Sequence, residues 1–202
     1  TVPAIFVDFV VVVENPANHM QTFGSQLNED FFRGDVVHKQ STKTYPLNER
    51  KVIARRAAML LNEDTKILNY GIGVPEIIAK VLQEEGLNDR FIPTVEPGAI
   101  GGTPASGLDF GCSIGPEAII DQPYMFDFYD GGGIDAAFLG LAQCDSSGNI
   151  NVSKFGPKIA GCGGFINITQ NARQLAFCGT FTAGGLKVQA DKGKLEILQE
   201  GR

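Results

Sequence analysis

Glu96 is the carboxylate in this sequence whose neighbours most favour covalent chemistry. It precedes Pro97 and a run of glycines that includes Gly98 and Gly101. Pro97 restricts the backbone of Glu96 to extended conformations, and the glycines let a ligand tail pass close to the backbone. A glutamate that is kept from water beside donors for an oxyanion can act as a nucleophile. The residues alone equally allow a solvated glutamate in an ordinary turn.

Two further glycine clusters are candidates for those donors. Gly71-Ile72-Gly73 separates a predicted strand from a predicted helix, whose N-terminus carries about half a positive charge. Glu76 occupies a position where a dinucleotide-binding GxGxxG motif needs a small residue, so that motif is incomplete. Gly161-Cys162-Gly163-Gly164-Phe165 can present amides to a thioester or a phosphate. Each cluster can instead be a tight turn or a bulge where backbones cross.

Other reactive side chains point less clearly to a site. Cys162 has no histidine near it in sequence, which disfavours a catalytic thiol. Three aspartates that might bind a divalent metal lack the alternate-ligand spacing of a calcium loop: Asp127, Asp130 and Asp135. No CxxC pair joins the four cysteines, and the only histidines are His19 and His38. The sequence therefore predicts no metal site.

Composition and charge exclude some classes of partner. The net charge of -6 disfavours nucleic acid, which needs basic patches. No apolar run reaches the roughly 18 residues that span a bilayer, so no membrane partner is expected. The cysteines Cys112, Cys144, Cys162 and Cys178 are scattered, which fits a reducing compartment and predicts a cytoplasmic protein.

The first half of the chain is predicted to alternate between strands and helices around the candidate residues. Strands are expected over residues 4–14, 66–70 and 90–95, although Pro93 weakens the last. Asn48 is expected to cap a helix that ends near Leu61, and Pro75 to open a second helix that stops at Gly86. Residues 16–46 form an irregular connection, long enough to wrap over a partner or a second domain.

The second half is predicted to be mostly strands. They are expected over residues 136–142, 150–153, 165–169 and 175–181, with a hairpin turn at residues 145–148. A closing hairpin is expected from 186–190 and 195–198. Together the elements predict an α/β fold with a mixed sheet.

Five segments resemble the class I CoA-transferases, in particular the single-chain acetate/propionate and 3-ketoacid type. They are NYGIGVPE (69–76), TVEPGAIGG (94–102), DQPYMFDFYDGGG (121–133), AFLGLAQCDSSGNINVSKFGPKIAGCGGFINITQNA (137–172) and FCGTFTAGGLKV (177–188). The stretch AIFVDFVVV also resembles the family's link between its two halves. The resemblance implies a NagB/RpiA-like fold, an open mixed and largely parallel sheet with flanking helices.

The resemblance also implies roles for individual residues. Glu96 matches the family's nucleophile, which passes through a mixed anhydride and a glutamyl-CoA thioester in a ping-pong reaction without metal or redox cofactor. Gly163, from the GxGGF-type motif, is the expected oxyanion donor, and Val74 is expected to supply another because Pro75 has no N–H. Coenzyme A (CoA), the substrate, is expected to bind along the glycines of the three clusters: Gly71, Gly73, Gly98, Gly101, Gly161 and Gly164.

The resemblance covers only the glutamate-bearing part of such a transferase. It implies an arm over residues 1–46 from the region between two domains, and a catalytic domain over residues 47–202 that is a fragment of a longer chain. The expected partners are acyl-CoA, short-chain carboxylates, the missing N-terminal half and further copies in a homo-oligomer. An acyl-CoA hydrolase on the same scaffold and a non-catalytic binding or assembly subunit remain alternatives.

Overall fold

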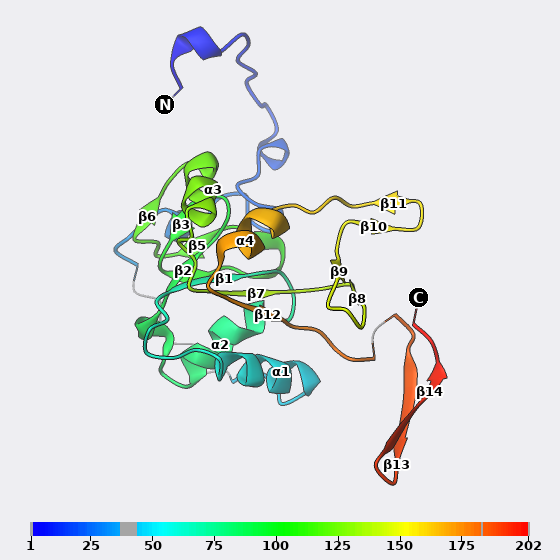
Figure 1. Ribbon diagram of the computed structural model, residues 1–202. Coiled ribbons are helices and arrows are strands. Elements are labelled where there is room, and N and C mark those ends of the chain that lie inside the picture. The colour runs from blue at the N-terminus through cyan, green and yellow to red at the C-terminus, as the bar shows by residue number, and fades with distance from the viewer. Residues whose placement is uncertain (1, 37–43, 183, 202) are drawn as a thin grey trace.

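A six-stranded sheet lies at the centre of the computed structural model, which describes residues 2–36, 44–182 and 184–201 (Figure 1). In spatial order its strands are β12 (Gln174–Phe177), β7 (Ala136–Leu139), β1 (Ile67–Tyr70), β2 (Ile92–Thr94), β3 (Ala99–Ile100) and β6 (Ala118–Ile119). The first four are parallel, and β3 and β6 add antiparallel pairs. The predicted open, mixed and largely parallel sheet is confirmed.

Four helices cover the two faces of this sheet (Figure 1). Helices α1 (Glu49–Ala58) and α2 (Glu76–Glu84) lie on one face, and α3 (Gln122–Asp130) and α4 (Phe165–Asn171) lie on the other. Because side chains alternate along a strand, Leu68 and Tyr70 of β1 pack toward α1 and α2. Asn69, between them, faces α3, where its amide reaches Tyr129. The alternation in β1 thus places one polar side chain on the α3 side.

Local signals in the sequence explain how the first two helices begin and end. The Asn48 side chain accepts a hydrogen bond from Lys51 N at 3.0 Å, which confirms the predicted N-cap. Helix α1 stops at Ala58, three residues before the predicted end at Leu61. Pro75 occupies the cap position of α2, one residue outside the helix. Gly86, with φ +68°, ends α2 as predicted.

Two predicted strands are wrong. Residues 165–169 form the start of helix α4 instead, because Phe165 and Ile168 lie one turn apart and both pack against the α3 side of the core. Tertiary packing overrides the strand preference of this isoleucine-rich segment. Residues 4–14 form one 3-10 turn (Ala4–Phe6) followed by unpaired chain. A strand needs a partner, and no described strand pairs with this one.

Four short two-stranded ribbons surround the central sheet. They are β4 (Thr103–Pro104) with β5 (Ser113–Ile114), β8 (Gln143–Cys144) with β9 (Ile150–Asn151), β10 (Lys154–Phe155) with β11 (Lys158–Ile159), and β13 (Lys187–Asp191) with β14 (Lys194–Gln199). The predicted hairpin at residues 145–148 and the predicted closing hairpin are confirmed. Figure 1 shows that β10–β11 and β13–β14 extend away from the sheet, as does the N-terminal segment.

Part of the segment over residues 16–46 packs against the body of this chain, and its predicted wrap over a partner or a second domain stays a prediction. Phe31 is buried, and Gly115 N donates to Asp30 O at 2.8 Å. Residues 37–43, which include His38, lie outside the described part of the chain. The division into residues 1–46 and 47–202 stays a prediction.

Candidate functional site

Glu96 lies in a tight turn that links β2 to β3 at the carboxyl end of a parallel strand. Val95 N donates to Ala99 O at 3.0 Å, and Gly98 N donates to Val95 O at 2.9 Å. Gly98 has φ +127°, and a Cβ at that position would lie 1.8 Å from Ile120 O. Only glycine fits there, and the two backbone hydrogen bonds hold the turn. Ligands of open α/β sheets bind beyond the carboxyl ends of parallel strands, which is where this turn lies.

Three side chains from separate elements form a hydrogen-bonded network beside Glu96. Asn69 of β1 directs its amide Nδ2 toward Glu96 Oε1 at 3.5 Å and toward Tyr129 Oη at 3.4 Å. Tyr129 of α3 donates to Thr94 Oγ1 at 3.0 Å, and Thr94 donates to Leu68 O at 3.0 Å. Asn69, Thr94 and Tyr129 are fully buried. The network ties the carboxylate to the core of the α3 face.

The surroundings of Glu96 destabilise its charged form. Burial raises the pKa of this carboxyl, and the backbone N–H of Glu96 and the Asn69 amide oppose the rise in pKa only partly. Glu96 Oε2 is buried and has no hydrogen-bond partner among the described residues; the same is true of Asn69 Oδ1. Buried polar atoms are normally paired, so two orphans side by side indicate a place where a ligand or a reacting group fits.

Tyr129 experiences the same environment. Burial raises the pKa of Tyr129 to about 12, and the negative charge of Glu96 adds to the rise in that pKa. The phenol therefore stays protonated at neutral pH and remains a hydrogen-bond donor. Its role in the network is to position, since it donates to Thr94 rather than to the carboxylate.

A cavity of about 620 Å3 brings Glu96 together with two of the predicted glycine clusters. Its lining includes Gly71 from the β1–α2 turn and Gly161, Gly163 and Gly164 from the segment before α4. Adding a Cβ to Gly161 or Gly163 would meet nothing within 4 Å, so their backbones face open space. The remaining wall is largely apolar and includes Phe110, Phe126, Leu139, Val152 and Ile168.

The other predicted site residues lie outside this cavity. Gly73 N donates to the side chain of Glu76 at 3.0 Å, so its amide is engaged by the helix that follows. Val74 packs against the core beneath α2. Gly98 shapes the turn that carries Glu96. The predicted roles of Val74 as a donor and of Gly73 and Gly98 in binding CoA stay predictions.

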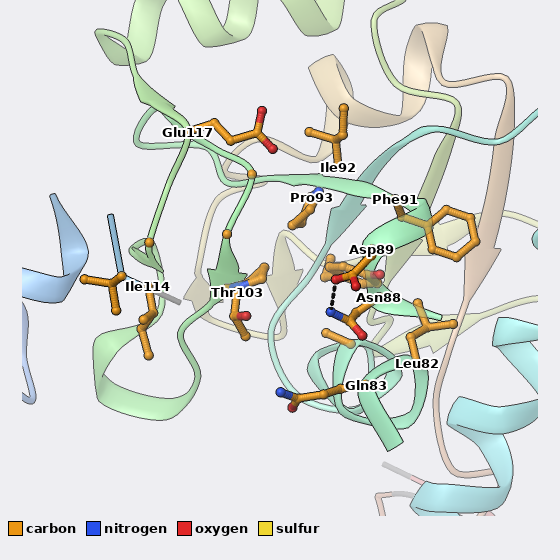
Figure 2. A pocket seen from close by; sticks show the side chains of 17 residues that line it. Leu82, Gln83, Asn88, Asp89, Phe91, Ile92, Pro93, Thr103, Ile114 and Glu117 are labelled. Atoms are coloured by element: carbon orange, nitrogen blue, oxygen red, sulfur yellow. Dashed lines mark hydrogen bonds between the residues drawn. The ribbon is translucent and has the colours of Figure 1, made fainter. Parts of the chain in front are cut away.

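Gly101 lines a separate cavity of about 390 Å3, shown in Figure 2. Its N–H donates to Pro93 O at 2.8 Å, and a Cβ there would come within 2.8 Å of the Glu117 side chain. Figure 2 shows Glu117 above this cavity and the hydrogen-bonded pair Asn88 and Asp89 across it. Gly101 therefore allows a close approach between chain segments, and its predicted contact with CoA stays a prediction.

Residues outside the glycine clusters prove important to the geometry. Asn69 does carry a signal in the sequence, because its amide interrupts the otherwise apolar strand Ile67–Tyr70. Tyr129 and Thr94 carry no such signal. Their partnership depends on how α3 crosses the sheet, which spacing along the chain does not reveal.

The remaining candidates of the sequence lie apart from one another or play local roles. Cys162 lines the Glu96 cavity. Asp135 accepts hydrogen bonds from Lys66 N and Ile67 N at 2.9 Å, whereas Asp130 accepts from the Asn167 amide. Within the described residues, no group of three His, Cys, Asp or Glu side chains is arranged to hold a metal ion. The described helices include none long and apolar enough to cross a bilayer.

Comparisons with known proteins find CoA-transferases that are similar to this chain. Acetate CoA-transferase YdiF of Escherichia coli strain K12 is 44% identical over all 202 residues, and caffeate CoA-transferase of Acetobacterium woodii is 46% identical over 207 aligned positions. The chain spans 37% and 39% of the lengths of these two relatives. A scan against protein-family models finds no match.

Solved structures of CoA-transferases share the fold of this chain. Two crystal structures of acyl-CoA transferase YdiF from E. coli O157:H7 match with TM-scores of 0.64 and 0.63, at 45% and 44% identity. One is the apoenzyme and the other is a thioester complex with CoA. Each match covers 80% of this chain and 30% of the solved chain. Over its whole length the chain is therefore homologous to one part of these CoA-transferases, and it corresponds to about two fifths of the length of its curated relatives.

Proposed function

We propose that the protein carrying this chain transfers CoA from a short-chain acyl-CoA or 3-ketoacyl-CoA to a carboxylate acceptor such as acetate, through a glutamyl-CoA thioester on Glu96. The observation that carries this proposal is the placement of one buried carboxylate, with a free oxygen, in a cavity lined by glycine backbones. The thioester complex with CoA of the YdiF relative supports the same type of intermediate.

The reaction runs through two acyl transfers in each half. Glu96 attacks the thioester carbonyl of acyl-CoA, forming a C–O bond and expelling CoA thiolate, which leaves a mixed anhydride. The thiolate then attacks the glutamyl carbonyl and expels the first carboxylate, so a glutamyl-CoA thioester remains. An incoming carboxylate reverses both steps and departs as the new acyl-CoA. Each step exchanges one nucleophile for one leaving group, so this chemistry requires no metal or redox cofactor.

Backbone amides are the proposed stabilisers of the oxyanions. Gly163 lines the cavity and has open space beside it, which supports its proposed role as a donor to a tetrahedral intermediate; Val74, two residues before α2, is the second proposed donor. Removing one such donor typically costs about 3 kcal/mol of transition-state stabilisation. CoA is proposed to run along Gly71, Gly161 and Gly164, with Gly73, Gly98 and Gly101 at the margins.

The proposed partners follow from the fact that this chain corresponds to less than half the length of its relatives. The cavity is open to solvent here, whereas the anhydride and thioester must be protected from water. We propose that the part of the protein equivalent to the relatives' N-terminal half closes over Glu96, and that the complete protein is a homo-oligomer of the cytoplasm. The isolated segment of 202 residues is then poorly active.

Mass analysis of the complete protein tests the proposal. After incubation with acyl-CoA without acceptor, digestion should yield a peptide containing Glu96 whose mass is raised by one CoA, less water. Adding acetate should discharge the adduct and form acetyl-CoA. Free CoA released without an acceptor would instead identify a hydrolase, and a Glu96→Gln protein with full activity would identify a non-catalytic role for this carboxylate.

A further inference from the structure

A second cavity adjoins the one that contains Glu96. It has a volume of about 510 Å3, and its lining mixes the polar residues Asn18, Gln21 and Thr22 with apolar ones that include Met20, Phe23, Pro97, Phe110 and Gly111. The last three residues also line the Glu96 cavity. Only this thin wall, which begins with the residue after the nucleophile, separates the two spaces.

The wall is compact because glycine permits a close approach. Gly111 has φ +103°, and a Cβ there would lie 3.1 Å from Pro97 Cγ. A larger residue would push the Phe110 segment away from the Glu96 turn. With glycine present, Pro97 and Phe110 stay close together between the two cavities, so they are the side chains that a group attached to the Glu96 carboxylate would pass on the way to the second cavity.

The two cavities offer apolar surface and very little charge. Glu96 is the only Asp or Glu among the described lining residues, and no Lys, Arg or His lines either cavity. His19 is next to Met20 in sequence but is not part of the lining. A second carboxylate on the substrate would therefore approach the Glu96 charge without a compensating cation from the described residues of this chain, which is unfavourable in a partly dry site.

We propose that the acyl group carries an apolar tail, longer than acetyl and without a second charge, and that this tail crosses the Pro97–Phe110 wall into the second cavity against Met20 and Phe23. The inference rests on the proposed function, because it assigns the two compartments to the two parts of an acyl-CoA. CoA occupies the glycine-lined cavity, and the acyl tail occupies the second cavity.

The complete protein and four acyl-CoA substrates test this assignment. In a ping-pong reaction, kcat/KM for the acyl-CoA reports only the first half-reaction, so the acceptor can be held constant. From acetyl-CoA to butyryl-CoA to hexanoyl-CoA, kcat/KM should rise by up to about fourfold per methylene, the factor expected for burying that group. Succinyl-CoA should react more slowly than butyryl-CoA. An optimum at acetyl-CoA, or equal rates for succinyl-CoA and butyryl-CoA, would overturn the proposal.

Two variants locate the tail. Met20→Ala and Phe110→Ala should each reduce the hexanoyl-to-acetyl ratio of kcat/KM by roughly three- to tenfold, because both remove apolar surface from the second cavity. Leu27→Ala is the matched control, since Leu27 is an exposed apolar residue of the same arm that lines neither cavity. An unchanged ratio in both variants would contradict the placement.

The same experiment separates the two levels of the argument. If none of the four acyl-CoA substrates leaves an adduct on Glu96, the proposed function and the tail assignment fall together. If the adduct forms but acetyl-CoA is preferred, CoA transfer stands and the tail assignment alone is overturned.

Discussion

At the scale of single residues, Glu96 combines two properties that seldom occur together in a surface turn. Its side chain is largely removed from water, and one of its oxygens accepts no hydrogen bond from the described residues. Burial raises its pKa, so the carboxylate is a stronger base than an exposed glutamate once it has lost its proton. This environment favours nucleophilic attack over the solvation of a structural charge.

Glu96→Gln should abolish activity and stabilise the fold. Loss of the covalent nucleophile should lower kcat by at least about 10³-fold. The substitution also removes a charge that folding buries, so the melting temperature at pH 7 should rise. Glu117→Gln, at an exposed carboxylate, should change neither quantity. Retention of activity in Glu96→Gln, with calorimetry showing no gain in stability, would contradict both assignments.

The pH dependence should show the raised pKa of Glu96. Because the folded protein holds this proton more tightly than the unfolded chain, the carboxylate is lost as pH falls through the raised pKa. The acid limb of kcat/KM should therefore lie above the value of about 4.3 that is typical of glutamate. Asn69→Leu should move this limb to still higher pH, since the Asn69 amide lowers the pKa of Glu96.

Protonation of Glu96 removes activity but should increase the stability of the fold. A carboxyl whose pKa is raised by folding destabilises the protein when it is charged, so this destabilisation is relieved as pH falls through the raised pKa. In the Glu96→Gln protein that dependence should disappear. Comparison of the two melting curves across this window isolates the contribution of Glu96.

At the scale of elements, helix α3 positions the site through Tyr129. Tyr129→Phe removes the donor to Thr94 and leaves the Thr94 and Asn69 groups short of a partner inside the core. We expect a loss of about 1–3 kcal/mol in the free energy of unfolding and roughly a tenfold lower kcat/KM. Tyr124→Phe, on the same helix but exposed, should do neither. A shift in the acid limb of the Tyr129→Phe profile would show that Tyr129 acts through the network, because a merely structural loss would leave the pKa of Glu96 unchanged.

The β2–β3 turn is a second element that positions the site, and steric contact with the chain beside it restricts one of its positions to glycine. Gly98→Ala would place a methyl group against Ile120 O and would also strain a backbone of positive φ, so we expect several kcal/mol of destabilisation or failure to fold. Gly148→Ala is the matched control. Gly148 also has positive φ, but its Cβ would meet nothing, so its cost should be about 1 kcal/mol. Denaturant unfolding of both variants measures the difference.

The elements that could be predicted from sequence are those with strong local signals. Asn48 and Gly86 bound their helices because a side-chain cap and a positive φ act within one turn of chain. Residues 145–148 and 191–193 form turns for the same reason. Helix α4 was missed because its strand-like residues are held in a helix by contacts with α3. In the site, the glycine clusters were found from composition, whereas Tyr129 needed the crossing of α3 over the sheet.

At the scale of the whole molecule, two apolar surfaces remain uncovered in this chain. The arm exposes more than 80% of Phe9, Val10, Val11 and Val12. In the β13–β14 ribbon, Val188 pairs with Ile197 and Ala190 with Leu195, so one face is apolar while its flanking positions are charged or polar. An isolated two-stranded ribbon is marginally stable at best. We expect both segments to be covered by other parts of the complete protein.

Hydrogen exchange in the complete protein tests this expectation. Backbone amides of residues 8–13 and of β14 should exchange at least about 100-fold more slowly than in an unstructured peptide, because pairing and burial suppress local opening. The β8–β9 turn at residues 145–148, which is exposed here, serves as an internal reference and should exchange quickly. Fast exchange of the arm and ribbon would show that nothing covers them.

The orphaned oxygen of Glu96 has a consequence for how the reaction starts. Because Oε2 accepts nothing among the described residues, its conversion into the bridging atom of an anhydride releases no donor that would then need a new acceptor. In the proposed reaction, no hydrogen bond from the described residues to this oxygen has to break before the first covalent bond forms. The carboxylate would therefore start from the arrangement in which it attacks, without first exchanging an internal partner.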